Sequence, residues 1–141
     1  MQSPNCIVVG HSLGGIIAWH IAQHNQNIIK GASITTPFGG FSMTSLRLPL
    51  FFMPTIIPNM LQELDRNNWF SSQPRNNKSR VPWVNIVGNK GMFTTYENDG
   101  VLTTKSQKEL YYDEENVTWY VLPYTHMEIT HADEIYDLIR R

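Results

Sequence analysis

The chain has 141 residues, enough for one domain with a single hydrophobic core. Apolar residues make up 41% and charged residues 16%, which is a globular composition and not a disordered one. The formal net charge of −1 gives no reason to expect a nucleic-acid partner or an anionic membrane surface. Cys6 is the only cysteine, which excludes an internal disulfide and disfavours a cysteine-based metal site.

The apolar segments do not predict a membrane span. Residues 46–61 form the most apolar stretch, but three prolines interrupt it. The first five residues lack the basic start and apolar run of a secretory signal, so the sequence indicates no particular compartment.

The first predicted elements are a strand and a helix separated by a tight turn. Residues 6–9 are apolar and mostly β-branched, which favours a strand buried on both faces. Gly10 ends the strand, and the apolar spacing over 13–23 predicts an amphipathic helix. Residues 28–35 predict a second strand, closed by Pro37 and two glycines.

Further alternation follows a long insert, residues 38–80, that holds half of the prolines and could form a helix over 59–68. Strands are predicted at 81–87 and 117–122, with helices at 103–112 and 132–140. Strands that alternate with helices in this way predict one α/β domain with a parallel sheet of about four strands flanked by helices.

The strongest motif is Gly10-His11-Ser12-Leu13-Gly14, which contains the pattern G-x-S-x-G between the first strand and helix. A sharp turn there lifts the serine hydroxyl above the sheet edge, and small neighbours leave room for it. We therefore expect Ser12 to be a nucleophile and the Leu13 backbone N–H to hold an oxyanion. An ordinary glycine-rich turn is the alternative.

Activation of the serine needs a base, and the chain has five histidines. His11 lies within the turn itself, and His20 and His24 are expected on a solvated helix face. His126 follows the last strand by a short turn and is the favoured base, with His131, one turn later, as the alternative.

The acid of the triad is expected between the serine and the histidine in the chain. Asp99 follows the third strand, on the same sheet edge as the serine and the histidine, and is favoured over Glu97. Residues 113–115 are expected at the opposite edge.

These segments together resemble the α/β-hydrolase superfamily, especially its lipase-like and GPI inositol-deacylase-like branches. The elbow at Ser12, the Thr36-Pro37 pair before two glycines, Asp99-Gly100-Val101 and the loop at His126 each resemble a family segment. The resemblance implies acyl transfer through Ser12, His126 and Asp99.

The resemblance also implies strands before the nucleophile strand and an early loop that supplies a second oxyanion N–H. Residues 1–5 provide neither, so we expect this chain to be the C-terminal portion of a longer enzyme. Without an earlier neighbour, residues 6–9 are expected to form an exposed apolar edge.

The insert matches the place where lipase-like members often carry a cap over the active site. We expect it to bind the acyl part of a substrate or to touch a lipid surface transiently, and packing on the protein's own core is equally compatible. The residues expected at the substrate are Phe38, Phe51, Phe52 and Met53.

The predicted function is therefore hydrolysis of a small-molecule carboxylic ester or lipid, with no metal and no organic cofactor implied. Two alternatives stay open. One is a catalytically impaired fragment or binding module that lacks the oxyanion loop, and the other is an acyltransferase or thioesterase using the same triad.

Overall fold

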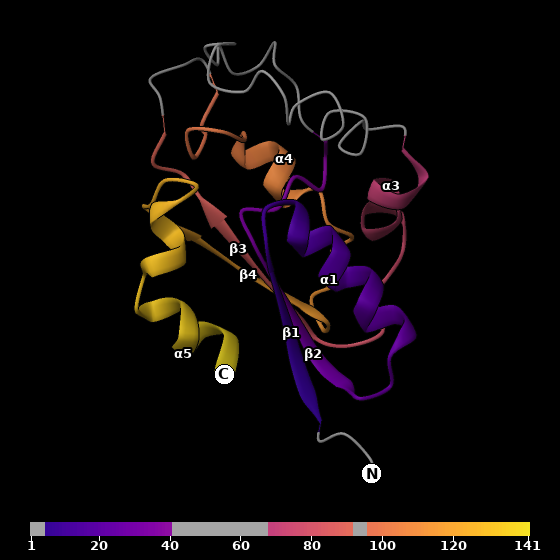
Figure 1. The fold of residues 1–141 in the computed structure, drawn as a ribbon. Helices are drawn as coiled ribbons and strands as arrows, with labels where there is room; N and C mark the ends of the chain where they lie inside the picture. Colours follow the sequence, from indigo (N-terminus) through magenta and orange to yellow (C-terminus); the bar gives the residue numbers. More distant parts are fainter. Residues whose placement is uncertain (1–4, 41–67, 92–95) are drawn as a thin grey trace, which may run out of the picture.

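A computed structural model describes residues 5–40, 68–91 and 96–141. Strands and helices alternate along the described chain (Figure 1). The elements are β1 (Cys6–His11), α1 (Leu13–His24), β2 (Ile28–Ile34), α3 (Trp69–Asn76), β3 (Trp83–Gly88), α4 (Thr104–Lys108), β4 (Val117–Leu122), the 3-10 helix η2 (Glu128–His131) and α5 (Glu134–Arg140).

The four strands form one parallel sheet in the order β1-β2-β3-β4. This confirms the predicted α/β class and the sheet of about four strands flanked by helices. Because every strand runs in the same direction, the loops that follow β1, β3 and β4 leave the sheet at one edge. The three predicted catalytic residues lie in or beside these loops.

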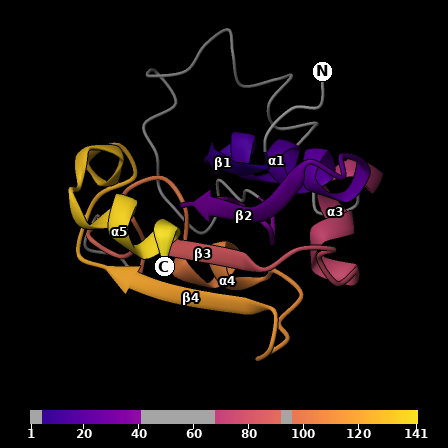
Figure 2. The same ribbon diagram turned by 90° about the horizontal axis from the view of Figure 1, so that it is seen from below.

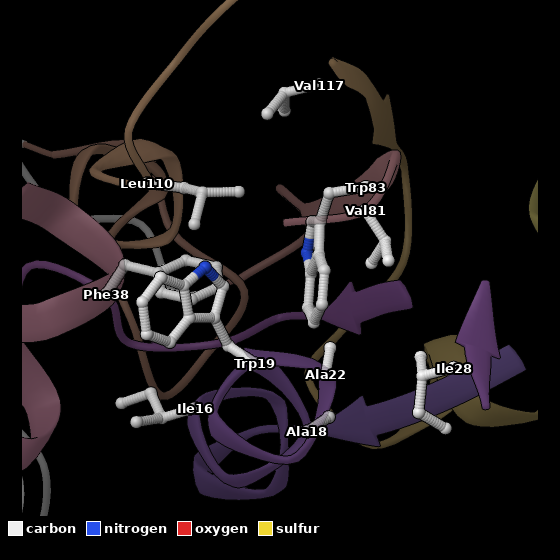
Figure 3. Packing of buried hydrophobic residues seen from close by; sticks show 10 residues of the cluster. All are labelled: Ile16, Ala18, Trp19, Ala22, Ile28, Phe38, Val81, Trp83, Leu110 and Val117. Carbon is white, nitrogen blue, oxygen red and sulfur yellow. The ribbon is translucent and has the colours of Figure 1, made fainter. Parts of the chain in front are cut away.

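One face of the sheet is covered by α1, whose apolar side packs against Trp83 of β3 (Figure 3). The Trp83 indole N–H donates to the Ser33 hydroxyl over 2.9 Å, so its one polar atom is paired inside the core. Gly31 lies under this ring, and a Cβ there would overlap it. The buried cluster consists of Ile16, Ala18, Trp19, Ala22, Ile28, Phe38, Val81, Trp83, Leu110 and Val117.

The opposite face is covered by η2 and α5, and Figure 2 shows α5 and α1 on different sides of the sheet. Ile129, Ile135 and Ile139 pack there against residues of β2 and β3. This cover does not reach β1, where Ile7 is 41% and Val9 is 47% exposed. Since β1 pairs only with β2 among the described strands, the expected apolar edge is present.

Two predicted helices have different bounds in the structure. The helix expected over 103–112 ends at Lys108, because Leu110 turns into the core and the Tyr111 N–H donates to the carbonyl of Pro74. The helix expected over 132–140 begins at Glu134, and the separate turn η2 precedes it. In both places a tertiary contact decides where the helix stops or starts.

Helix α3 lies within the predicted insert, where no helix was expected after residue 68. Asn68 caps it by accepting hydrogen bonds from the Phe70 and Ser71 N–H groups, the local chemistry that starts a helix. The helix predicted over 59–68 falls almost entirely outside the described residues. No helix in the described part of the chain is long and apolar enough to cross a membrane.

Candidate active site

Ser12 stands at the turn between β1 and α1 in a strained backbone conformation, with φ 56° and ψ −130°. Such a conformation persists only where the surroundings hold it. The Ser12 N–H donates to the Ile34 carbonyl over 2.9 Å, which ties the turn to β2. A Cβ on Gly10 would overlap the backbone of Gly14, and one on Gly15 would lie 2.8 Å from Thr36 Cγ2. The turn therefore requires glycine at both positions.

The start of α1 points unpaired donors toward the serine. Leu13 is the first residue of this 12-residue helix, and its N–H has no hydrogen-bond acceptor among the described residues. The helix dipole places partial positive charge at the same end. The free Leu13 N–H and the positive end of the helix dipole would both stabilise an oxyanion that forms on a substrate at Ser12.

Asp99 lies in the loop between β3 and α4 with none of its surface exposed. Its Oδ1 accepts hydrogen bonds from the N–H groups of Val101, at 2.9 Å, and Leu102, at 2.6 Å. Its Oδ2 lies 2.6 Å from Nδ1 of His126. Both carboxylate oxygens are thus paired, as burial of a charged group requires.

Gln107 fastens this loop to the sheet and was not anticipated from the sequence. Its amide oxygen accepts the Gly88 N–H at 2.9 Å, and its amide nitrogen donates to the Gly88 carbonyl at 3.1 Å. The same nitrogen lies 3.4 Å from the carbonyl oxygen of Leu102. A glutamine on a short helix has no local pattern that marks it, so only the fold identifies this role.

The loop that carries His126 is closed by a reciprocal pair of hydrogen bonds. The Glu128 N–H donates to the Thr125 hydroxyl, and the Thr125 N–H donates to the Glu128 carboxylate, each at 3.2 Å. The Thr125 N–H is the main cause of a lowered pKa at Glu128, and Lys90 adds to it from 3.3 Å. The spacing Thr-x-x-Glu is a capping-box signature that sequence reasoning could have used.

The contact with Asp99 fixes the orientation of the His126 ring. Since an ionised carboxylate only accepts, Nδ1 carries the hydrogen and Nε2 keeps its lone pair. Nε2 has no hydrogen-bond partner among the described residues, and in particular no hydrogen bond joins it to the Ser12 hydroxyl. The neighbour of Ser12, His11, nevertheless contacts His126 directly, with ring centroids 4.8 Å apart.

The alternative acid and base lie elsewhere. His131 is exposed at the end of η2, and exposed Glu97 accepts a hydrogen bond from Asn89. Asp113 lies at the amino end of β4, where it pairs with Lys78 at 2.7 Å. The fold therefore brings Asp99, and neither Glu97 nor Asp113, to a histidine.

The two histidines of α1 differ in environment. His24 is exposed, as expected for a solvated helix face. His20 is not free in solvent, because its ring stacks on Phe70 with centroids 3.9 Å apart and its Nε2 lies 2.7 Å from the Phe70 carbonyl. Helix α3, which the sequence did not predict, creates this contact.

Of the residues expected at the substrate, Phe38 is fully buried in the core cluster on the α1 face. A side chain without exposed surface presents nothing to a ligand in this conformation. Phe51, Phe52 and Met53 lie outside the described residues, as does most of the predicted cap.

Comparison with known proteins identifies the fold of this chain. No protein-family model and no curated protein sequence matches the chain. Several solved structures do, and one is an esterase from Pyrococcus furiosus with a TM-score of 0.64 and 16% identity. The match covers 95% of this chain and 50% of that one. The chain has a partial α/β-hydrolase fold.

Two other structures agree on the α/β-hydrolase fold. A lipase-esterase related protein from Clostridium acetobutylicum matches with a TM-score of 0.56 and 16% identity, over 98% of this chain and 68% of its own. A putative cell surface hydrolase from Lactobacillus plantarum has a TM-score of 0.51 and 19% identity, with coverages of 99% and 54%. The chain thus spans about half the length of two of these three structures.

Proposed function

We propose that this chain carries the nucleophile, base and acid of a serine hydrolase that cleaves carboxylic esters. The observation that carries the proposal is the 2.6 Å contact between buried Asp99 and His126, at the sheet edge where Ser12 occupies its strained turn. An aspartate, a histidine and a serine in this relationship form a proton-transfer chain on several unrelated folds. Two of the structural neighbours, an esterase and a lipase-esterase related protein, agree with this class of reaction.

In the first step, the Ser12 oxygen forms a bond to the ester carbonyl carbon while His126 Nε2 takes the hydroxyl proton. The C=O electron pair moves onto oxygen, and the Leu13 N–H donates to the resulting oxyanion. Collapse of this tetrahedral species expels the alkoxide, which receives the proton from His126, and leaves an acyl group on Ser12. Water then repeats the sequence with the same base and releases the carboxylic acid.

Asp99 supports both steps without giving up its charge. Its two bonds from Val101 and Leu102 hold the carboxylate in place, and Oδ2 keeps His126 in the tautomer whose Nε2 is the base. When Nε2 is protonated, the nearby carboxylate stabilises the imidazolium. The Ser12 hydroxyl must move into contact with Nε2 when substrate binds, since active-site hydrogen bonds often tighten only in the complex.

We propose an apolar acyl group for the substrate, on the basis of the apolar residues between 46 and 61. An acyltransferase or thioesterase reaction would use the same side chains. The ratio of acid to ester formed from p-nitrophenyl esters in the presence of an alcohol separates hydrolysis from acyl transfer.

A fluorophosphonate probe tests the proposal directly, because it reacts with an activated serine and needs no knowledge of the substrate. We expect one phosphonyl group per chain, mapped to Ser12 by peptide mass spectrometry and absent in Ser12→Ala. Ser72→Ala, a helix serine remote from His126, is the matched control and should label normally. A folded wild-type chain that is not labelled would support the binding-module alternative.

A further inference from the structure

His11 connects the nucleophile turn with the loop that carries His126. It is the last residue of β1 and immediately precedes Ser12. Its Nε2 lies 2.8 Å from the backbone carbonyl oxygen of His126, 115 residues further along the chain. The two rings also touch, with centroids 4.8 Å apart and planes tilted by 46°.

The chemistry of this contact fixes the hydrogen position on His11. A carbonyl oxygen can only accept, so Nε2 of His11 must carry the hydrogen. The contact also differs from the Asp99–His126 pair in what it holds. Asp99 binds the His126 ring through Nδ1 and accepts its backbone N–H, whereas His11 binds the His126 carbonyl and ties it to the residue next to the serine.

We propose that His11 is a positioning residue, which sets the separation of Ser12 and His126 through its Nε2–H bond to the His126 carbonyl. This inference rests on the proposed function for its catalytic meaning. Among the described residues, the other hydrogen bonds that hold the His126 loop involve Asp99, Lys90 and residues of the loop and of η2, none of which lies next to the serine in the chain. His11 therefore links the turn that carries Ser12 to the loop that carries His126.

The charge state of His11 supports its role as a positioning residue. Burial lowers the pKa of His11, and the nearby His126 lowers it further, although the His126 carbonyl and Asp99 act in the opposite direction. A neutral His11 keeps its donor at Nε2 and leaves the positive charge of the reaction to His126. A second cation at a ring distance of 4.8 Å would oppose proton transfer from the serine.

Substitutions at His11 can separate the hydrogen bond from the ring contact. In His11→Gln the side-chain amide nitrogen reaches the position of Nε2, so the donor is kept. In His11→Asn the donor is too short to reach the carbonyl, and in His11→Phe the ring remains without a donor. His24→Gln, an exposed change on α1, is the matched control.

The rate of fluorophosphonate labelling at Ser12 is the first measurement. We expect labelling of His11→Asn and His11→Phe to be slower by roughly 5- to 100-fold. The lower figure corresponds to the loss of one hydrogen bond, and the higher one to displacement of the base from the serine. His11→Gln should stay within about threefold of the wild type, because its donor is retained. Wild-type labelling rates in folded His11→Asn and His11→Phe would overturn the proposal.

NMR of protein labelled with 15N-histidine is the second measurement, and it needs no activity. We expect His11 in the Nε2–H tautomer, and a His126 ring signal that shifts or broadens in His11→Phe but not in His11→Gln. An Nδ1–H tautomer at His11 in the wild type would overturn the proposal even if the variants do not fold. A wild-type chain that never labels at Ser12 would instead refute the proposed function. The His11 tautomer measured by NMR would still show whether Nε2 of His11 donates to the His126 carbonyl.

Discussion

Asp99 and His126 are joined twice, once through their side chains and once through their backbones. Oδ2 lies 2.6 Å from Nδ1, and the His126 N–H donates to the Asp99 carbonyl over 2.8 Å. Two hydrogen bonds, one between side chains and one between backbones, therefore tie the acid loop to the base loop.

Replacement of Asp99 by asparagine tests the orienting carboxylate. The amide removes the negative charge that stabilises the imidazolium and can present a donor to Nδ1, which favours the wrong tautomer. We expect labelling at Ser12 and ester hydrolysis to fall by about 10³- to 10⁴-fold. Asp113→Asn, at the amino end of β4, should leave both rates unchanged. Equal rates for the two variants would remove Asp99 from the mechanism.

The glycines after Ser12 offer a matched pair for stability. A methyl group on Gly15 would lie 2.8 Å from Thr36 Cγ2, whereas one on Gly14 would meet nothing within 4 Å. We expect Gly15→Ala to lower the free energy of unfolding by about 1–3 kcal/mol through overpacking. Gly14→Ala should raise it by about 0.5–1 kcal/mol, because alanine loses less entropy in a helix. Urea denaturation measures both, and a neutral Gly15→Ala would contradict the close packing of α1 against Thr36, in the segment that follows β2.

The capping hydroxyl of Thr125 is expected to stabilise the His126 loop. Thr125→Val keeps the shape of the side chain but leaves the Glu128 N–H without its acceptor, at a cost of about 0.5–2 kcal/mol. The amide protons of 126–128 should then exchange faster with solvent, and labelling of Ser12 should slow. Thr130→Val, whose hydroxyl donates to the exposed turn at Met127, serves as the control. Unchanged exchange in Thr125→Val would show that other contacts fix the loop.

The lowered pKa of His11 predicts a pH dependence of stability. A histidine with a lowered pKa binds fewer protons in the folded state than in the unfolded state, so stability falls as pH drops below the ordinary value of 6.5. We expect the urea midpoint of the wild type to decrease between pH about 7.5 and about 5.5. His11→Gln removes the titrating ring and should reduce this decrease, while exposed His24→Gln should not. A slope that His11→Gln leaves unaltered would place the pH dependence elsewhere.

Much of the fold could be predicted because its signals are local. The apolar run at 6–9, the glycines around Ser12 and the apolar spacing over 13–23 each act within a few residues. They predicted β1, the turn and α1 closely, and the same reasoning located β2 and β4. The end of α4 could not be predicted, since Leu110 leaves the helix to reach a core made of distant residues.

The sequence by itself determined the order of strands and helices, the strained serine turn and the side of the sheet where a site could form. Backbone stereochemistry and apolar periodicity suffice for these, because they depend on neighbours along the chain. Only the tertiary structure decided that Asp99 rather than Glu97 meets His126, that Gln107 fastens the acid loop, and that His11 reaches the His126 carbonyl. Those contacts join residues from 19 to 115 positions apart, and such pairs form only when the packed sheet sets the distance between its loops.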